Sequence, residues 1–270
     1  MPKPDGAAQV GIGVEISGSI ATVTIDAPPV NAFTIARYER MAEIFEALNE
    51  RVDVNCVILT AAGTKAFSAG LDIHEFLATP VERDDERQAI GMRAFVAVRN
   101  CPVPVIAAIN GFALGAGMAF AALCDIRIAS EGATFGLPEI NVGRCGGAAF
   151  VSRYVPEGSV RLMFFTGEPI GAHEAHRLGL VEQVVAPRKL AAAAREVAEV
   201  IAAKSPIGLR IGKQSLNAAE GLRYDAGYEI EQRYSAELVK TADSREALQA
   251  LVERRLPVFA ELNADTGAPQ

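Results

Sequence analysis

Residues 110–117 read NGFALGAG, and they follow the apolar run VPVIAAI at residues 103–109. This run is too short for a core helix, so it predicts a strand that is buried on both faces. The glycines then lie at a turn from a strand into a helix, where the first N–H groups of the helix have no partner within it. Gly115 and Gly117 carry no side chain that would block a ligand. The turn therefore predicts an α/β fold with a partly positive socket for an oxygen that gains negative charge.

A second turn of the same kind occurs earlier in the chain. Residues 65–73 read KAFSAGLDI, and they follow the strand-like run VILT at residues 57–60. Small residues again lead from a strand into a helix. Two such turns can direct two backbone N–H groups at one oxygen, which is the arrangement of an oxyanion hole. The two turns together predict a site that stabilises an oxyanion.

Four motifs together resemble those of the crotonase (enoyl-CoA hydratase/isomerase) superfamily. They are the two turns above, CDIRIA at residues 124–129 and FGLPE at residues 135–139, in the order and spacing of that family. The resemblance extends from about residue 14 to residue 259. It implies an α/β fold, a crotonase-like (ClpP/crotonase) spiral of ββα units with a helical C-terminal subdomain. It also implies an acyl-CoA thioester as substrate and no separate cofactor, since coenzyme A is part of that substrate.

The composition narrows the function classes. The chain has 270 residues, of which 50% are hydrophobic, yet no segment has the length and purity of a membrane span. A net charge of −7 without a basic cluster argues against nucleic acid as a partner. The four cysteines are scattered without a CxxC pair, which favours buried free thiols, and His173 and His176 have no third ligand that would indicate a metal site. These features predict a soluble, globular, cytoplasmic protein.

The predicted elements change in type near residue 200. The chain is expected to open with a hairpin at residues 14–16 and 20–25, and Thr34 can cap a helix that ends near Arg51. Residues 78–86 are charged and contain Pro80, which predicts a mobile loop beside the site. Further strands are predicted at residues 54–60, 125–129 and 181–185, and helices at 73–77, 87–100, 158–165, 172–178, 190–203, 206–220, 222–241 and 244–254.

Three segments follow from this order of elements. Residues 1–10 lack the apolar core of a signal peptide and are expected to form a disordered leader. Residues 11–200 form the expected crotonase-like α/β core, and residues 201–270 form a helical C-terminal region. In the family that the chain resembles, this last region trims the acyl pocket and builds trimers that often pair into hexamers. The resemblance therefore implies a homotrimer or a hexamer that is a dimer of trimers.

Glu139 is the acid expected to carry the chemistry. Its neighbours Leu137, Ile140 and Val142 are apolar, so its carboxylate is expected to be partly desolvated and to have a raised pKa. Charged residues are mostly exposed, so a solvated loop glutamate is the alternative interpretation from the residues alone. The resemblance implies that Glu139 is the catalytic acid/base.

Ala119 is the main departure from the family pattern. The hydratases of the family use a second glutamate at this position, and an alanine can neither hold a water nor move a proton. The nominal activity by resemblance is enoyl-CoA hydratase. A one-carboxylate reaction is the alternative, in which Glu139 moves a proton between two carbons and so isomerises the double bond. A catalytically weak scaffold that binds CoA thioesters is a third hypothesis.

The resemblance also implies which other residues meet the substrate. Ala69 and Ala116 match the positions whose backbone N–H groups form the oxyanion hole. The residues expected to bind substrate are Lys65, Ala66, Gly70, Asp72, Ile73, Leu114, Gly115, Pro138 and Phe259.

Several of these residues have a second interpretation. Lys65 meets a phosphate of coenzyme A or lies in solvent, and Phe259 covers the nucleotide or packs in a core. Asp72 and Asp125 are expected to cap helices or brace turns.

Two further side chains near the site have open roles. His74 contacts substrate or solvent. Arg144, five residues after Glu139, either pairs with Glu139 and lowers its pKa, or binds a polar acyl tail.

Overall fold

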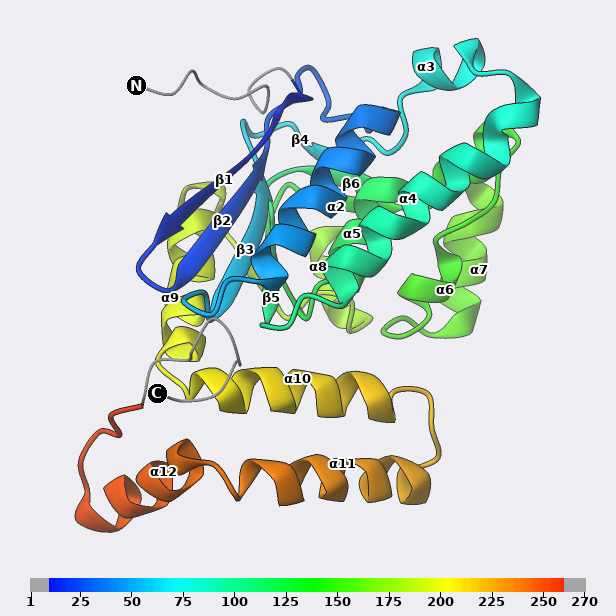
Figure 1. The fold of residues 1–270 in the computed structure, drawn as a ribbon. Coiled ribbons are helices and arrows are strands. Elements are labelled where there is room, and N and C mark those ends of the chain that lie inside the picture. The colour runs from blue at the N-terminus through cyan, green and yellow to red at the C-terminus, as the bar shows by residue number, and fades with distance from the viewer. Residues whose placement is uncertain (1–9, 260–270) are drawn as a thin grey trace.

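A computed structural model describes residues 10–259, which contain a six-stranded sheet. Figure 1 shows how helices pack around it. The strands are β1 (Ile12–Ser17), β2 (Ile20–Ile25), β3 (Cys56–Ala61), β5 (Val105–Ile109), β7 (Ile126–Ser130) and β10 (Gln183–Val185), in that spatial order. β1 and β2 pair antiparallel, which confirms the predicted hairpin, and every other pair in this sheet is parallel. All five residues of β5 are buried, as the apolar run predicted.

A second sheet consists of four very short strands that the sequence did not predict. They are β4 (Ala66–Ser68), β6 (Phe112–Leu114), β8 (Thr134–Gly136) and β9 (Ile170–Gly171), in that order. Each of the first three follows a strand of the large sheet, and β4 and β6 then lead into a helix. The result is the expected spiral of ββα units, which brings both glycine-containing turns to the end of the small sheet.

Helices cover both faces of the large sheet. Successive side chains of β3 point to opposite faces of the sheet, so they pack against different helices. Val57 and Leu59 join the larger core with α2 (Ile35–Asn49) and α4 (Asp84–Arg99). Cys56 and Ile58 join a smaller core under α9 (Leu190–Ala202).

The helix starts show which local predictions hold. Thr34 caps α2, as predicted, because its side chain accepts a hydrogen bond from the Arg37 N–H group. The loop predicted at residues 78–86 is wrong in part, since Val81–Arg83 form a 3-10 helix and α4 begins at Asp84. The acids that suggested a solvated loop lie in the first turn of α4, where negative charge stabilises a helix.

The C-terminal helices form a layer of their own. Figure 1 shows α10 (Pro206–Ala219), α11 (Tyr224–Leu238) and α12 (Ala242–Glu253) below the sheet. Lys213 of α10 is buried, and its Nζ donates to Asp125 at 2.7 Å and to the Val103 carbonyl at 3.0 Å. Asp125 also accepts from the Val105 N–H group, which confirms its predicted bracing role. This ion pair ties the helical region to the start of β5.

The remaining elements are short. They are α3 (Ile73–Ala78), α5 (Ala116–Leu123), η2 (Pro138–Val142), α6 (Ala148–Val151), α7 (Glu157–Thr166), α8 (Ala172–Arg177) and η3 (Pro187–Lys189). The sequence predicted α3, α7 and α8, and missed η2, α6 and η3. The expected disordered leader lies outside the described residues except for Val10.

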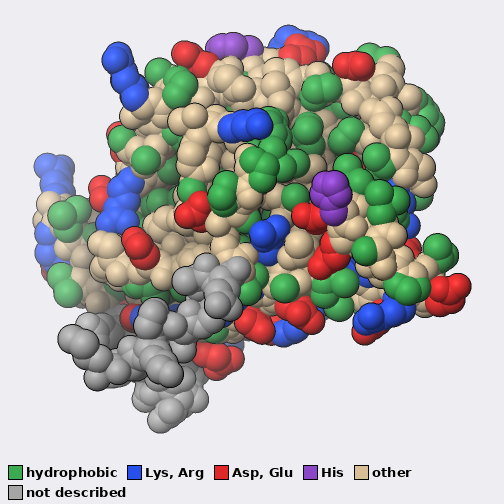
Figure 2. Space-filling view, turned by 90° about the horizontal axis from the view of Figure 1, so that it is seen from above, with side chains coloured by type: hydrophobic (Ala, Val, Ile, Leu, Met, Phe, Trp, Pro, Cys, Tyr) green, Lys and Arg blue, Asp and Glu red, His purple; other side chains and the backbone are tan. Residues whose placement is uncertain are grey.

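The cysteines, the surface charges and the apolar helices can be compared with what the composition predicted. Cys56, Cys101 and Cys124 are buried free thiols, as predicted, and Cys145 is exposed. On the face seen in Figure 2, Lys and Arg side chains are scattered among Asp and Glu. Within residues 10–259, no helix combines the length and the apolar character that crossing a membrane requires.

Candidate active site

The two glycine-containing turns meet, as the sequence predicted. Gly70 has φ +94°, and a Cβ placed on it would lie 3.0 Å from the Leu114 carbonyl oxygen and 3.4 Å from the Ala116 nitrogen. Gly115, with φ +53°, lies just before the first residue of α5 (Ala116–Leu123). Only glycine combines such backbone angles with so close an approach. The first turn therefore lies directly against the N-terminus of α5.

The backbone N–H groups at these turns correct one predicted role. The Ala69 N–H group donates to the Val30 carbonyl at 2.9 Å, so it is not free to bind an oxyanion in this structure. Ala69 was therefore the wrong residue for the first donor, although it lines the cavity described below. The reason is tertiary: a segment about forty residues earlier occupies the N–H group.

Leu71 offers the free N–H group at this turn. It forms a parallel bridge with Phe33, in which the Phe33 N–H group donates to the Gly70 carbonyl and the Asp72 N–H group to the Phe33 carbonyl. In a parallel bridge of this kind, the N–H group of the central residue points away from the partner strand. In the described part of the chain, the N–H groups of Leu71 and Ala116 have no hydrogen-bond acceptor. Both residues line the same cavity.

Glu139 faces these turns from η2. A Cβ placed on Gly115 would lie 3.3 Å from Glu139 Oε1, and one placed on Gly147 would lie 3.8 Å from it. Glu139 Oε2 is buried and has no hydrogen-bond partner among the described residues. Burial raises the pKa of the Glu139 carboxyl, which confirms the predicted direction. The cause differs in detail, because Ile140 and Val142 are exposed and only Leu137 of the apolar neighbours is buried.

A cavity of about 450 Å³ joins these groups. Of the residues predicted to act on substrate, it is lined by Ala69, Gly70, Ile73, Gly115, Ala116, Pro138 and Glu139. Ala119 also lines it, at the position where the hydratases of the resembled family carry a second glutamate. Among the described lining residues, Glu139 is the only acid.

The cavity lining also contains residues that sequence reasoning missed or left open. Tyr38 of α2 and Phe95 of α4 line the cavity, and neither was assigned to the site from the sequence. Arg87 of α4 and Arg144, which follows η2, line it as well. Arg144 donates to Asp84 at 3.0 and 3.1 Å, so the alternative in which it pairs with Glu139 is wrong.

Five predicted substrate-binding residues lie outside the cavity lining. Lys65 is exposed, Ala66 is buried in β4, and Leu114 is half-buried at the end of β6. Asp72 caps α3, because its carboxylate accepts from the His74 and Glu75 N–H groups at 3.0 Å each. Phe259 is half-buried at the end of the described chain. Their contacts with substrate stay predictions, and His74 is exposed on α3.

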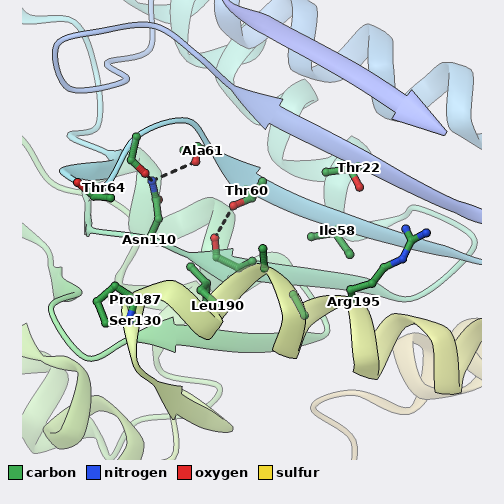
Figure 3. Close-up of a pocket in the computed structure, with 14 residues that line it drawn as sticks. Thr22, Ile58, Thr60, Ala61, Thr64, Asn110, Ser130, Pro187, Leu190 and Arg195 are labelled. Atoms are coloured by element: carbon green, nitrogen blue, oxygen red, sulfur yellow. Dashed lines mark hydrogen bonds between the residues drawn. The ribbon is translucent and has the colours of Figure 1, made fainter. Parts of the chain in front are cut away.

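A second cavity, of about 340 Å³, lies between α9 and the large sheet (Figure 3). Three of its polar side chains donate hydrogen bonds or form an ion pair within the protein. The Thr60 hydroxyl donates to the Ala108 carbonyl, Asn110 donates to the Ala61 carbonyl, and Arg195 pairs with Glu199. No acid lies among the described residues that line it. General acid–base chemistry therefore belongs to the cavity of Glu139.

Fold and site together define a CoA-thioester enzyme of the crotonase type. A family profile described as Enoyl-CoA hydratase/isomerase matches residues 15–262, and the chain belongs to this family. Members of the family are enzymes that act on CoA thioesters.

Two curated relatives and one solved structure illustrate the similarity. A "(7aS)-7a-methyl-1,5-dioxo-2,3,5,6,7,7a-hexahydro-1H-indene-carboxyl-CoA hydrolase" of Mycobacterium tuberculosis is 39% identical over 87% of this chain and 95% of its own length. A short-chain-enoyl-CoA hydratase of Clostridium acetobutylicum is 36% identical over 90% of this chain and 94% of its own. The crystal structure of an enoyl-CoA hydratase from Bacillus anthracis superposes with a TM-score of 0.89 at 33% identity, over 92% of this chain and 98% of that one.

Proposed function

We propose that this protein moves a proton between two carbons of an enoyl-CoA thioester and so isomerises its double bond. The N–H groups of Leu71 and Ala116 bind the thioester oxygen, and Glu139 is the acid/base. One observation carries the proposal: Glu139 is the only acid among the described residues that line the cavity. A reaction that needs one carboxylate fits this lining better than one that needs two.

The proposed steps balance without any further reactant. Glu139, as a carboxylate, removes a proton from C2 of a 3-enoyl-CoA, and the electron pair moves into the thioester to form a dienolate. The two N–H groups bind the oxygen that becomes negative, and each such donor is worth about 3 kcal/mol in the transition state. Glu139, now a carboxylic acid, returns the proton to C4, which yields the conjugated 2-enoyl-CoA. A raised pKa suits both the removal and the return of a proton near neutral pH.

Hydration of a 2-enoyl-CoA is the second candidate, and the name of the Clostridium relative favours it. In this chain Ala119 supplies no second carboxylate, so the water would be held by Glu139 and backbone groups alone. The names of the two relatives differ in reaction, one hydratase and one hydrolase. A shared enolate-stabilising core with exchangeable acid–base groups would account for that difference.

One absorbance experiment separates these reactions. The protein is incubated with a 2-enoyl-CoA and, separately, with a 3-enoyl-CoA, and the absorbance of the conjugated thioester is followed. With the 3-enoyl-CoA, the absorbance of the conjugated thioester is expected to rise, which supports isomerisation. If this absorbance falls with the 2-enoyl-CoA and does not rise with the 3-enoyl-CoA, hydration replaces the proposal. Neither change, with CoA-thioester binding intact in a titration, would leave only the scaffold hypothesis.

We also propose a cytoplasmic homotrimer, alone or paired into a hexamer, with coenzyme A bound only as part of the substrate. Exposed apolar side chains on the C-terminal helices support the assembly, since a solvated layer would not be expected to present so many of them. They include Leu216, Tyr224, Tyr228, Leu248, Leu251 and Val252. Exposed Lys65 is proposed to meet a phosphate of coenzyme A. Light scattering of the purified protein tests the assembly.

A further inference from the structure

Two arginines form a positively charged wall in the cavity of Glu139. Arg87 comes from the first turns of α4, and Arg144 comes from the turn after η2. Both side chains line the cavity and are largely enclosed, with exposed fractions of 11% for Arg87 and 24% for Arg144. The Arg87 guanidinium lies 5.0 Å from the centre of the Phe76 ring and that of Arg144 lies 4.9 Å from it. The ring therefore holds both guanidinium groups in place.

A single carboxylate stands behind this pair of cations. Arg87 donates to Asp84 Oδ1 at 3.1 and 2.9 Å, and Arg144 donates to Asp84 Oδ2 at 3.0 and 3.1 Å. Gln88 donates to the same carboxylate at 2.6 Å. These hydrogen bonds hold the pKa of the Asp84 carboxyl well below its usual range, and the largest contributions come from Gln88 and then Arg144. Asp84 is therefore ionised. Asp84 itself does not line the cavity.

The charges of this cluster do not cancel. Two guanidinium groups face one carboxylate, which leaves one positive charge on the cavity wall. Glu139, the acid that lines the same cavity, forms no ion pair with either arginine among the described contacts. Glu75 accepts from the Ile35 N–H group at 2.7 Å and forms none with them either. An excess cation in a half-enclosed site attracts an anion more strongly than it would in open solvent.

Both guanidinium groups retain donors that a ligand can use. Each carries five N–H groups, and each commits two nitrogen atoms to Asp84. Among the described residues, no remaining nitrogen atom of either guanidinium group is both buried and without a hydrogen-bond partner. A carboxylate is the anion that matches the planar fork of an arginine.

The backbone fixes Arg144 relative to Glu139. The Arg144 N–H group donates to the Glu139 carbonyl at 2.9 Å, and Gly143 between them adopts the left-handed conformation with φ +68°. This turn directs the arginine to the same cavity as the catalytic candidate. The acid/base and the cation are therefore held by one short element.

We propose that Arg87 and Arg144 form a subsite for a carboxylate on the acyl group, so that the preferred substrate is a CoA monothioester of a dicarboxylic acid. This inference rests on the proposed function, because the acyl chain must extend from the oxyanion hole toward the arginines. The rival explanation is a purely structural cluster that holds the N-terminus of α4. A structural cluster would leave affinity for the acyl group independent of its terminal charge.

Binding of unreactive saturated thioesters tests the subsite without turnover. Succinyl-, glutaryl- and adipyl-CoA are compared by calorimetry with butyryl-, pentanoyl- and hexanoyl-CoA. At the chain length that reaches the arginines, the carboxylated thioester is expected to bind about tenfold to a hundredfold more tightly than its uncharged partner. Arg144→Gln and Arg87→Gln are each expected to remove most of this preference and to leave the affinity for the uncharged thioester unchanged.

Arg161→Gln is the matched control, because Arg161 lies in an exposed ion pair with Glu157 on α7, outside the cavity lining. It should keep the preference. Unchanged affinity for uncharged thioesters also shows that the two test variants are folded. No preference for carboxylated thioesters at any length, with uncharged thioesters bound, would overturn the subsite and leave the proposed function intact. Failure to bind any thioester would overturn both.

Discussion

Two parts of the cavity lining are built in different ways. Beside Glu139, the donors without a partner are the backbone N–H groups of Leu71 and Ala116, placed by glycines with positive φ. In the other part, long side chains of Arg87 and Arg144 converge from separate elements on Asp84. The first part depends on the path of the chain and the second on the identity of side chains. The comparison suggests that the reaction belongs to the fold and that substrate choice belongs to this particular sequence.

The largest effect is expected from removing the single acid among the described residues that line the cavity. Glu139→Gln is expected to lower the isomerisation rate by about a hundredfold to ten-thousandfold, because an amide neither accepts nor returns the proton. Affinity for a saturated acyl-CoA should stay within several-fold, since the arginines and the backbone donors are untouched. The rate is measured by absorbance and the affinity by calorimetry. Full activity in this variant would remove Glu139 from the mechanism.

The second prediction concerns a variant that would displace the backbone of the site. Gly70→Ala places a Cβ 3.0 Å from the Leu114 carbonyl oxygen and 3.4 Å from the Ala116 nitrogen. Displacement of the Ala116 N–H group is expected to cost about 3 kcal/mol of transition-state stabilisation, which is roughly a hundredfold in rate.

Gly63→Ala is the control for Gly70→Ala. Gly63 also has positive φ, +76°, but a Cβ there would meet nothing within 4 Å. Both variants suffer the same kind of backbone strain, so both should lose stability in thermal unfolding. Only Gly70→Ala should lose activity at a temperature where both are folded. Equal activity in the two variants would show that the close approach of the turns does not matter.

The same division explains what could be predicted from the sequence. The hairpin, the buried strand before Asn110 and the Thr34 cap depend on contiguous residues, and the structure confirms them. Strands of two or three residues, such as β4 and β6, are too short to show a period. They were therefore missed although the site depends on them.

The errors at the site share one physical cause, which is contact between distant segments. Whether Ala69 or Leu71 has a free N–H group depends on residues near Val30, which pair with one and leave the other. Whether Arg144 meets Glu139 or Asp84 depends on α4, which begins sixty residues earlier. No local pattern contains this information. That Glu139 and Ala116 line one cavity was easier to predict, because each lies on a motif that the family resemblance identified.

A smaller effect distinguishes two roles of Asp72, which lies outside the cavity lining at the start of α3. Its side chain caps α3, so Asp72→Ala is expected to cost that helix about 1 kcal/mol. Asp72→Asn keeps a capping oxygen and should leave the helix unchanged. Amide hydrogen exchange of residues 73–78 measures this difference. If Asp72 also binds substrate through its charge, both variants will lose acyl-CoA affinity, whereas a cap alone predicts that the Asn variant retains it.

The smallest expected effect is a pH-dependent gain in stability when Glu139 is replaced by Gln. Burial raises the pKa of Glu139 in the folded state above its value in the unfolded chain. Between these two pKa values the folded state binds more protons, so the free energy of unfolding falls as pH rises through that window. Above the folded pKa the ionised carboxylate carries its full desolvation cost, and Glu139→Gln removes it.

This variant should therefore melt at a slightly higher temperature than the parent at neutral pH, and the difference should vanish below the ordinary pKa of a glutamate. Thermal unfolding across this pH range checks the sign. A variant that is less stable at neutral pH would mean that the carboxylate has a stabilising partner in the folded protein. The cost of burying Glu139 is then the counterpart of its proposed role, because the burial that destabilises the fold also raises the pKa of the carboxyl toward the range that suits proton transfer.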